Sequence, residues 1–346
     1  MIRLDAGPIG GGGSFLRTAL VLSAILQKPV TIENIALERT FQGLSADKIA
    51  LIRALATATD AKLFGVETGS TTISFSPTHP WSQKKVALGL QGSVSLALQG
   101  LLLPALFSRQ KVRFLLTGRT HELHAPTTTY MQQVFFRYVN SLVDQLVLRV
   151  NSFGFESSGD VEVIVKGRVN RLPPLYVSGG ESLAGIRMEI IASKDYVDST
   201  VLEHLERLAR LTHPQLQVVT RYVASETPGI AAGVFAFYGN ELGFDNDKPF
   251  VIGKDIVLQH QPNTDALEKE FIGFVQGFVN ELTSPAIDEF CADQLIMLLA
   301  LVGGEIKVKE VTDQVKANIV AAEAISDTLF EVSGTIITAT LNLDAL

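Results

Sequence analysis

The chain has 346 residues, 47% of them hydrophobic, a formal net charge of −7 and a single cysteine. This length and apolar content suffice for one large domain or two, and the acidic charge excludes a general electrostatic coat for nucleic acid. One cysteine excludes a disulfide framework, and the apolar runs are too short to span a bilayer, so we expect a soluble, cytoplasmic protein with no membrane partner.

A glycine run, Gly10 to Gly13, follows a short apolar segment and opens a longer one. Glycines let the backbone turn sharply, and the N-terminus of a following helix offers unpaired N–H groups and a positive dipole end to an anion. Arg17, one turn further on, could grip the same anion with two donors. The alternative is a flexible loop before a core helix, with Arg17 on a solvated face. The run is neither a P-loop nor a good dinucleotide fingerprint.

The chain then repeats one order of elements three times. The first copy is predicted as helix 14–26, strand 29–32, helix 45–59 and strands 61–66 and 71–75. The second copy is predicted as strand 85–90, helix 94–107, strand 111–116, helix 127–142 and strands 146–151 and 160–166. The third is predicted as helix 293–301, strand 306–311, helix 314–324 and strands 327–332 and 335–341.

Landmark residues recur at matching spacings in the first two copies. Gly13-Ser14 precedes Arg39-Thr40 by 26 positions, and Gly92-Ser93 precedes Arg119-Thr120 by 27. Matching spacings of this kind indicate an internal repeat.

The closing strands of the three copies follow Asp60, Asp144 and Asp327, at intervals of 84 and 183 positions. The 99 extra positions in the second interval predict an inserted domain. We place it at 179–262, with the repeats occupying 1–178 and 263–346. The insertion reads as strand 186–192, helix 199–211 and strands 216–224 and 233–239, followed by a returning helix over 264–282.

Four motifs carry a family resemblance. They are Leu4-Asp5 with the glycine run and Leu16-Arg17, Gly92-Ser93 through Gln99 to Leu103–Leu106, Gly118-Arg119-Thr120 with Ala125-Pro126, and Ala292–Leu295 with Asn318-Ile319. On these motifs the chain resembles the RNA 3′-terminal phosphate cyclases over nearly its whole length. The resemblance implies an α/β (α+β) fold with three βαβαββ repeats around a pseudo-threefold axis and a smaller α/β domain inserted in the third repeat.

The resemblance also implies a reaction. Family enzymes use ATP and a divalent metal such as Mg²⁺ or Mn²⁺, and a histidine near the C-terminus takes AMP as a covalent adduct. AMP then passes to an RNA 3′-phosphate, and the neighbouring 2′-hydroxyl attacks to give a 2′,3′-cyclic phosphate. Neutral imidazole suits this role because it is a nucleophile near neutral pH.

This sequence departs from the family pattern at three places. The nucleophile position falls on Gln314, and no histidine follows His260. An amide side chain is not a competent nucleophile toward ATP. Gly10 stands where the family has an acidic residue, and 156–160 replaces its Pro-x-Gly-Gly-Gly stretch.

Other positions of the family site are retained. By the resemblance, the residues that would bind nucleotide or phosphate are Gly11, Gly12, Gly13, Arg17, Arg39, Gln99 and Asp293. Each has a plainer interpretation: Asp293 could stabilise a helix dipole, Arg39 could be a surface arginine, and Gln99 could be a buried amide with an internal partner.

Two histidines could replace the missing nucleophile. His121 and His124 lie in the loop after the second-repeat strand, on either side of Glu122. Either could take AMP, or the pair could bind a metal with Glu122. The plainer interpretation is a polar loop without a ligand.

These observations leave three hypotheses. The first is a cyclase-like pseudoenzyme in RNA processing that keeps an ATP- or nucleotide-binding groove and binds an RNA 3′ end or a protein partner. The second is an active RNA 3′-phosphate cyclase that uses His121 or His124. The third is a small-molecule enzyme on a similar repeat fold, such as an enolpyruvyl transferase, which the cyclase motifs disfavour.

Overall fold

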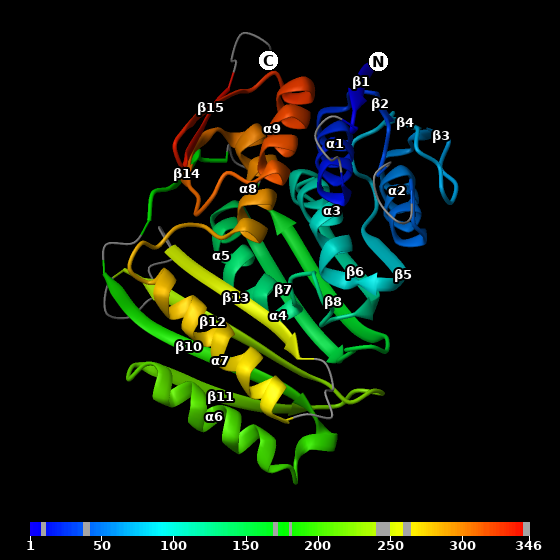
Figure 1. Ribbon diagram of the computed structural model, residues 1–346. Coiled ribbons are helices and arrows are strands. Elements are labelled where there is room, and N and C mark those ends of the chain that lie inside the picture. Colours follow the sequence, from blue (N-terminus) through cyan, green and yellow to red (C-terminus); the bar gives the residue numbers. More distant parts are fainter. Residues whose placement is uncertain are drawn as a thin grey trace.

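A computed structural model of the chain describes residues 1–7, 12–36, 42–168, 172–179, 182–239, 250–258 and 264–341. These residues form four four-stranded sheets with helices packed on them (Figure 1). No helix among them is long and apolar enough to cross a membrane.

Three of the sheets have the same topology. In each, the first two strands of a repeat pair in parallel, and two antiparallel strands complete the sheet. The strand orders are β1-β2-β4-β3, β5-β6-β8-β7 and β9-β14-β16-β15. This equivalence confirms the threefold repeat that the landmark spacings predict.

The elements of the repeats have the following bounds. The first repeat contains β1 (Ile2–Asp5), α1 (Gly13–Leu26), β2 (Val30–Glu33), α2 (Ala46–Thr59), β3 (Lys62–Phe64) and β4 (Ile73–Ser76). The second contains β5 (Lys85–Ser93), α3 (Val94–Phe107), β6 (Lys111–Arg119), a segmented helix, β7 (Val143–Ser152) and β8 (Gly159–Gly167). The third contains β9 (Leu175–Val177), α8 (Glu289–Val302), β14 (Gly304–Lys307), α9 (Asp313–Ser326), β15 (Leu329–Ser333) and β16 (Ile336–Thr340).

The fourth sheet lies between β9 and α8 in the chain, within the third repeat. Its elements are β10 (Leu183–Ser193), the 3₁₀ turn η3 (Lys194–Tyr196), α6 (Thr200–Thr212), β11 (Leu216–Val223), β12 (Ile230–Tyr238), β13 (Phe250–Leu258) and α7 (Thr264–Glu281). Figure 1 shows α6 and α7 side by side on this sheet, at the end of the molecule away from both termini. The residue boundaries 179 and 262 of the inserted domain remain a prediction.

Burial follows the sequence pattern. Helix α3 is apolar on all sides and almost wholly buried, whereas the amphipathic α6 buries only Leu202, Leu205 and Ala209. One continuous apolar core joins the repeats to the inserted sheet. The helices of the repeats are therefore fixed relative to one another, which is what positions the site.

The structure differs from the predicted elements in several places. The helix predicted over 127–142 is divided into α4 (Thr128–Tyr130), a π-helical turn η1 (Met131–Phe135), α5 (Phe136–Val139) and a 3₁₀ turn η2 (Asn140–Leu142). Strands β1, β9 and β13 were not predicted, and β14 ends at Lys307 rather than at 311.

Candidate functional site

The N-terminal turns of α1, α8 and α9 meet in a buried polar cluster. The amide nitrogen of Asn318 donates to the hydroxyl of Ser14 at 2.9 Å, and the hydroxyl of Thr18 donates to the Asn318 oxygen at 3.1 Å. The Ser14 hydroxyl also lies 3.3 Å from Asp293 Oδ2. Because buried polar groups need partners, these bonds fix three helix ends from distant parts of the chain in one place.

Gln314 lies at the exposed end of this cluster. It is exposed in the first turn of α9, where Thr312 caps the helix by accepting from the Val315 N–H at 3.2 Å. Residues four apart share a helix face, so Gln314 lies one turn outward of Asn318 on the same side. The position that the family resemblance assigns to the nucleophile is thus open to a ligand and carries an amide.

Asp293 and Arg17 form an electrostatic pair at the base of the site. Burial raises the pKa of Asp293 to about 6, against an opposing effect of the Arg17 charge. Burial lowers the pKa of Arg17 to about 10, and Asp293 opposes that shift, so Arg17 stays charged at neutral pH. Arg17 Nε and Asp293 Oδ1 are buried without a hydrogen-bond partner among the described residues. The pair therefore has unused hydrogen-bonding capacity.

Arg17 also lines a cavity of about 310 Å³, which we call the α1 pocket. Its other lining residues are Gly13, Leu16, Ser45, Asp47, Lys48, Leu51, Leu90, Gly92, Ser93, Leu96, Ala97 and Glu122. Helices α1 and α2 both begin here without a side-chain cap, whereas Ser93 caps α3. Uncapped first-turn N–H groups with the positive ends of two helix dipoles favour an anion.

Two glycines keep the α1 pocket open. A Cβ at Gly13 would lie 3.2 Å from Nη1 of Arg17, and a Cβ at Gly92 would lie 2.6 Å from Oδ2 of Asp47. A side chain at either position would displace a charged group of the pocket. Gly12 is the N-cap of α1, while Gly10, Gly11 and Arg39 lie outside the described residues.

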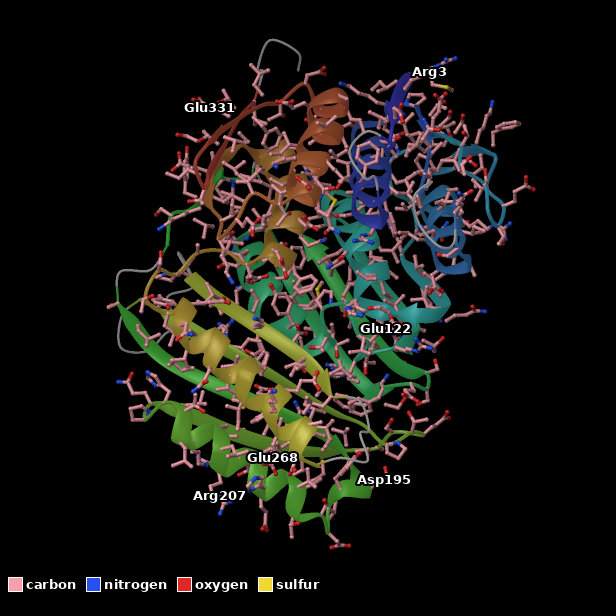
Figure 2. The ribbon with its side chains drawn as sticks, viewed as in Figure 1. Arg3, Glu122, Asp195, Arg207, Glu268 and Glu331 are labelled. Carbon is pink, nitrogen blue, oxygen red and sulfur yellow. The ribbon has the colours of Figure 1, made fainter. Side chains whose placement is uncertain are left out.

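A second cavity, of about 210 Å³, adjoins the first and is called here the Phe290 pocket. Its lining residues are Glu122, Leu123, His124, Ala125, Thr127, Asp255, Ile256, Val257 and Phe290. Glu122 lines both cavities, and Figure 2 shows it in the middle of the molecule. The two pockets therefore meet at Glu122, one among the repeats and the other against the inserted sheet.

Two half-buried aspartates lie beside the Phe290 pocket. Asp255 accepts from the Thr127 N–H at 2.6 Å, and Asp288 caps α8 by accepting from the Cys291 N–H at 3.0 Å and from the Tyr130 hydroxyl. Burial raises the pKa of each carboxyl to about 6. Each is thus an acceptor that gains a proton more readily than a surface aspartate.

The two candidate histidines differ sharply in their surroundings. His121 is buried, with ring centroids of Phe153 and Phe155 at 5.5 and 5.4 Å, and burial lowers its pKa to about 3. It is a neutral core residue that faces neither pocket. His124 is exposed, has a positive φ of 62° and lines the Phe290 pocket.

The remaining predicted site residue, Gln99, is buried on α3, and its Oε1 has no hydrogen-bond partner among the described residues. Within the described ranges, no three His, Cys, Asp or Glu residues are placed to hold a metal ion, so the His121–Glu122–His124 metal site is not formed.

Sequence reasoning missed Ser14, Asp255 and Phe290 as parts of the site, and it quoted Asn318 only as a motif. A signal existed for two of them. Asp255 interrupts an apolar strand, and Asn318 follows Gln314 by one helical turn.

Three α/β repeats, with helices that meet at a buried polar cluster beside the α1 pocket, define the fold class and the candidate site. The chain belongs to the RNA 3′-terminal phosphate cyclase family, whose model matches residues 9–332. It is 28% identical to the RNA 3′-terminal phosphate cyclase of Pyrococcus furiosus over 359 aligned residues, which cover 96% of each protein. It is also 28% identical to the cyclase of Gloeothece citriformis, with 92% of each chain covered, and 27% identical to that of Methanococcoides burtonii, with 96% covered.

Proposed function

We propose that this protein binds a nucleotide and an RNA 3′-phosphate but does not carry out the family's histidine adenylylation. One observation carries the proposal: the polar cluster of Ser14, Asp293 and Asn318 is intact, while the exposed position one turn above it is Gln314. The scaffold of the site is kept, and the residue that would form the covalent bond is replaced by an amide.

The α1 pocket would hold the phosphates of ATP in one complex and the 3′-phosphate of the RNA in another. The charged guanidinium group of Arg17 offers two parallel N–H donors, and the first turns of α1 and α2 offer backbone N–H groups. Lys48 lines the same cavity and adds a second positive charge. Asp47 and Glu122 line the same pocket and would repel a bare phosphate, so a divalent cation, Mg²⁺ or Mn²⁺, would accompany the phosphates, and these two carboxylates would supply oxygen ligands for it.

The base would lie in the Phe290 pocket. Phe290 supplies an aromatic ring against which a base can pack, and Asp255 supplies an acceptor for an exocyclic amino group. The adenine of ATP has such an amino group. Glu122 joins the two pockets, so a single nucleotide could reach both.

The chemistry of the missing nucleophile supports loss of adenylylation. A carboxamide nitrogen has its lone pair delocalised into the carbonyl and does not attack a phosphoryl group as imidazole does. His121 cannot substitute, because its ring is enclosed by Phe153 and Phe155.

A second candidate function rests on His124. Its exposed side chain lines the Phe290 pocket, so an active cyclase that uses His124 in place of the missing histidine is the alternative. The two functions differ in one property, the formation of a covalent AMP adduct.

Binding and turnover measured together test the proposal. We expect ATP and a 3′-phosphorylated oligonucleotide to bind in titrations, with no conversion of the 3′-phosphate to a cyclic phosphate. Turnover that disappears in His124→Gln would establish the alternative. Failure of both ligands to bind would overturn the proposal, leaving a protein partner as the function of the fold.

A further inference from the structure

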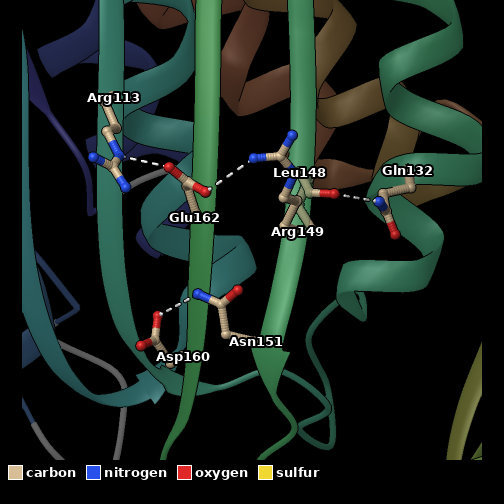
Figure 3. A network of polar contacts seen from close by, with 7 residues as sticks. All are labelled: Arg113, Gln132, Leu148, Arg149, Asn151, Asp160 and Glu162. Atoms are coloured by element: carbon tan, nitrogen blue, oxygen red, sulfur yellow. Dashed lines mark hydrogen bonds and ion pairs between the residues drawn. The ribbon is translucent and has the colours of Figure 1, made fainter.

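The outer face of the second-repeat sheet is an uncovered surface in the described structure, which we call the β6 face. Strand residues alternate between two faces. Those pointing inward, such as Phe114 and Val163, are buried under α3, whereas Lys85, Arg113 and Arg149 point outward and are exposed. Figure 3 shows this face of β6, β8 and β7 toward the viewer, with the helices behind it.

Like charges lie side by side on the β6 face. Lys85 of β5 is in register with Arg113 of β6, and Lys111 of β6 is in register with Lys166 of β8. Like charges directly opposite each other in a sheet are destabilising. Lys166 pairs with Asp144 at 3.2 Å. Among the described residues, Lys85 and Lys111 have no acidic group within ion-pair distance, so their charges are available to a bound anion.

The arginines of this face are held in place. Glu162, in the middle strand, accepts from Nε of Arg113 at 2.5 Å and lies 3.4 Å from Nη1 of Arg149 (Figure 3). One carboxylate between two guanidinium groups leaves a net positive charge and restricts both side chains to the sheet surface. The arrangement is preorganised for a polyanion, in a protein whose formal net charge is −7.

The β6 face leads into the α1 pocket. Strand β5 ends at Leu90, Gly92 and Ser93, which line that pocket, and the Gln91 N–H donates to Asp47 at 2.9 Å. Arg119 at the end of β6 pairs with Glu122 at 2.7 Å. With about 3.3 Å per strand residue, Lys85 lies about 20 Å from Gln91, which is the length of several nucleotides.

We propose that the β6 face binds the backbone of the single-stranded RNA segment that precedes the 3′-phosphate held in the α1 pocket. The inference rests on the proposed function, because it takes the α1 pocket as the site of the 3′ end. Continuity with that pocket favours RNA over an acidic peptide. Contacts to phosphates from lysine and arginine are independent of base sequence, so this segment would be read by charge rather than by sequence.

The test compares two RNAs that differ in length. A 3′-phosphorylated dinucleotide with its 3′-phosphate in the α1 pocket is too short to reach Lys85, whereas a 3′-phosphorylated dodecanucleotide is long enough to cross the β6 face. In Lys85→Gln/Lys111→Gln we expect dodecanucleotide affinity to fall about threefold or more and its salt dependence to fall by about 0.7 per lost contact. Dinucleotide affinity is expected to stay unchanged.

Matched substitutions on another sheet provide the control. Arg3→Gln/Lys62→Gln removes the same charge from the two edge strands of the first-repeat sheet, and Arg3 lies at the outer end of the repeats (Figure 2). This variant is expected to bind both RNAs like the wild type.

Each contrary result has a distinct meaning. Equal dodecanucleotide affinity in wild type and Lys85→Gln/Lys111→Gln would overturn the β6 face as the RNA path, while leaving the α1 pocket intact. An acidic peptide that competes as well as the dodecanucleotide would overturn RNA as the occupant. A wild-type protein that does not bind even the dinucleotide would overturn the proposed function and the RNA path with it.

Discussion

Asn318 on α9 donates a hydrogen bond to the hydroxyl of Ser14 on α1, and the two residues are 304 positions apart in the chain. Thr18 donates to the same asparagine, and Asp293 of α8 completes the cluster. The N-terminal turns of three helices are thereby held together, and the exposed Gln314 lies one helical turn outward of Asn318. The geometry of the candidate site depends on this buried cluster.

Replacing Asn318 should therefore be costly. Asn318→Leu keeps the side-chain size but leaves the hydroxyls of Ser14 and Thr18 without this partner in a dry interior. We expect a loss of about 2 kcal/mol in the free energy of unfolding, measured by chemical denaturation. Val320→Ala on the exposed side of α9 is the control and should change stability by less than about 0.5 kcal/mol. Equal stability of Asn318→Leu and the wild type would show that the cluster is not a structural support.

Asp288 should make stability depend on pH. Its pKa of about 6 in the folded protein, raised by burial, lies above the ordinary aspartate value of 3.8. Between these two pH values the folded protein holds a proton that the unfolded chain has released. The contribution of Asp288 to the free energy of unfolding therefore falls as pH rises through this range. Asp288→Asn keeps a capping oxygen and does not titrate. We expect it to exceed the wild type in stability above about pH 7, by on the order of 1–2 kcal/mol.

The matching control for that measurement is Asp313→Asn, which changes a carboxyl at the exposed start of α9. Thermal denaturation of the wild type, Asp288→Asn and Asp313→Asn over a pH series distinguishes the effect of Asp288 from that of the exposed Asp313. Parallel curves for Asp288→Asn and the wild type would contradict the assignment. The pH dependence that remains in Asp288→Asn should come partly from Asp255, whose pKa is also raised to about 6 by burial.

Arg17 should carry much of the affinity for phosphate. Arg17→Gln removes both the charge and the fork of donors, and we expect ATP and inorganic tripolyphosphate to bind at least about tenfold more weakly. Arg17→Lys should recover part of the loss, because it restores the charge without the fork. Isothermal titration measures both, with Arg3→Gln as the exposed control. Unchanged affinity in Arg17→Gln would place the phosphates elsewhere.

The two histidines should respond differently to truncation. His121→Ala removes a buried ring packed between Phe153 and Phe155 and should lower the free energy of unfolding by about 2 kcal/mol or more. His124→Ala removes an exposed ring and should leave stability within about 0.5 kcal/mol of the wild type. A stable His121→Ala protein would contradict the core role of His121.

The repeats could be predicted from the sequence because local hydrophobic periodicity indicates the order of their helices and strands. The spacing of the Gly-Ser and Arg-Thr pairs shows that this order recurs. It did not reveal β9, whose three residues are too short to show alternation. It also did not reveal the π-helical turn at Met131–Phe135, which interrupts an otherwise helical pattern.

The site was predictable only in part. Arg17 and Asp293 were expected near the nucleotide from family motifs, and the structure pairs them. The contact between Ser14 and Asn318 depends on how α1 and α9 pack, which no local pattern specifies. The sequence of the loop that contains His121 is polar. In the structure, however, the ring of His121 packs against Phe153 and Phe155 in the core.

Intact-mass measurement of the wild-type protein after incubation with ATP and Mg²⁺ or Mn²⁺, without RNA, tests the central claim most directly. We expect the mass to remain that of the unmodified chain, while ATP still raises the melting temperature. A stable increase by one AMP group would contradict the account, and peptide mapping would then show whether His124 had taken the place of the histidine that Gln314 replaces.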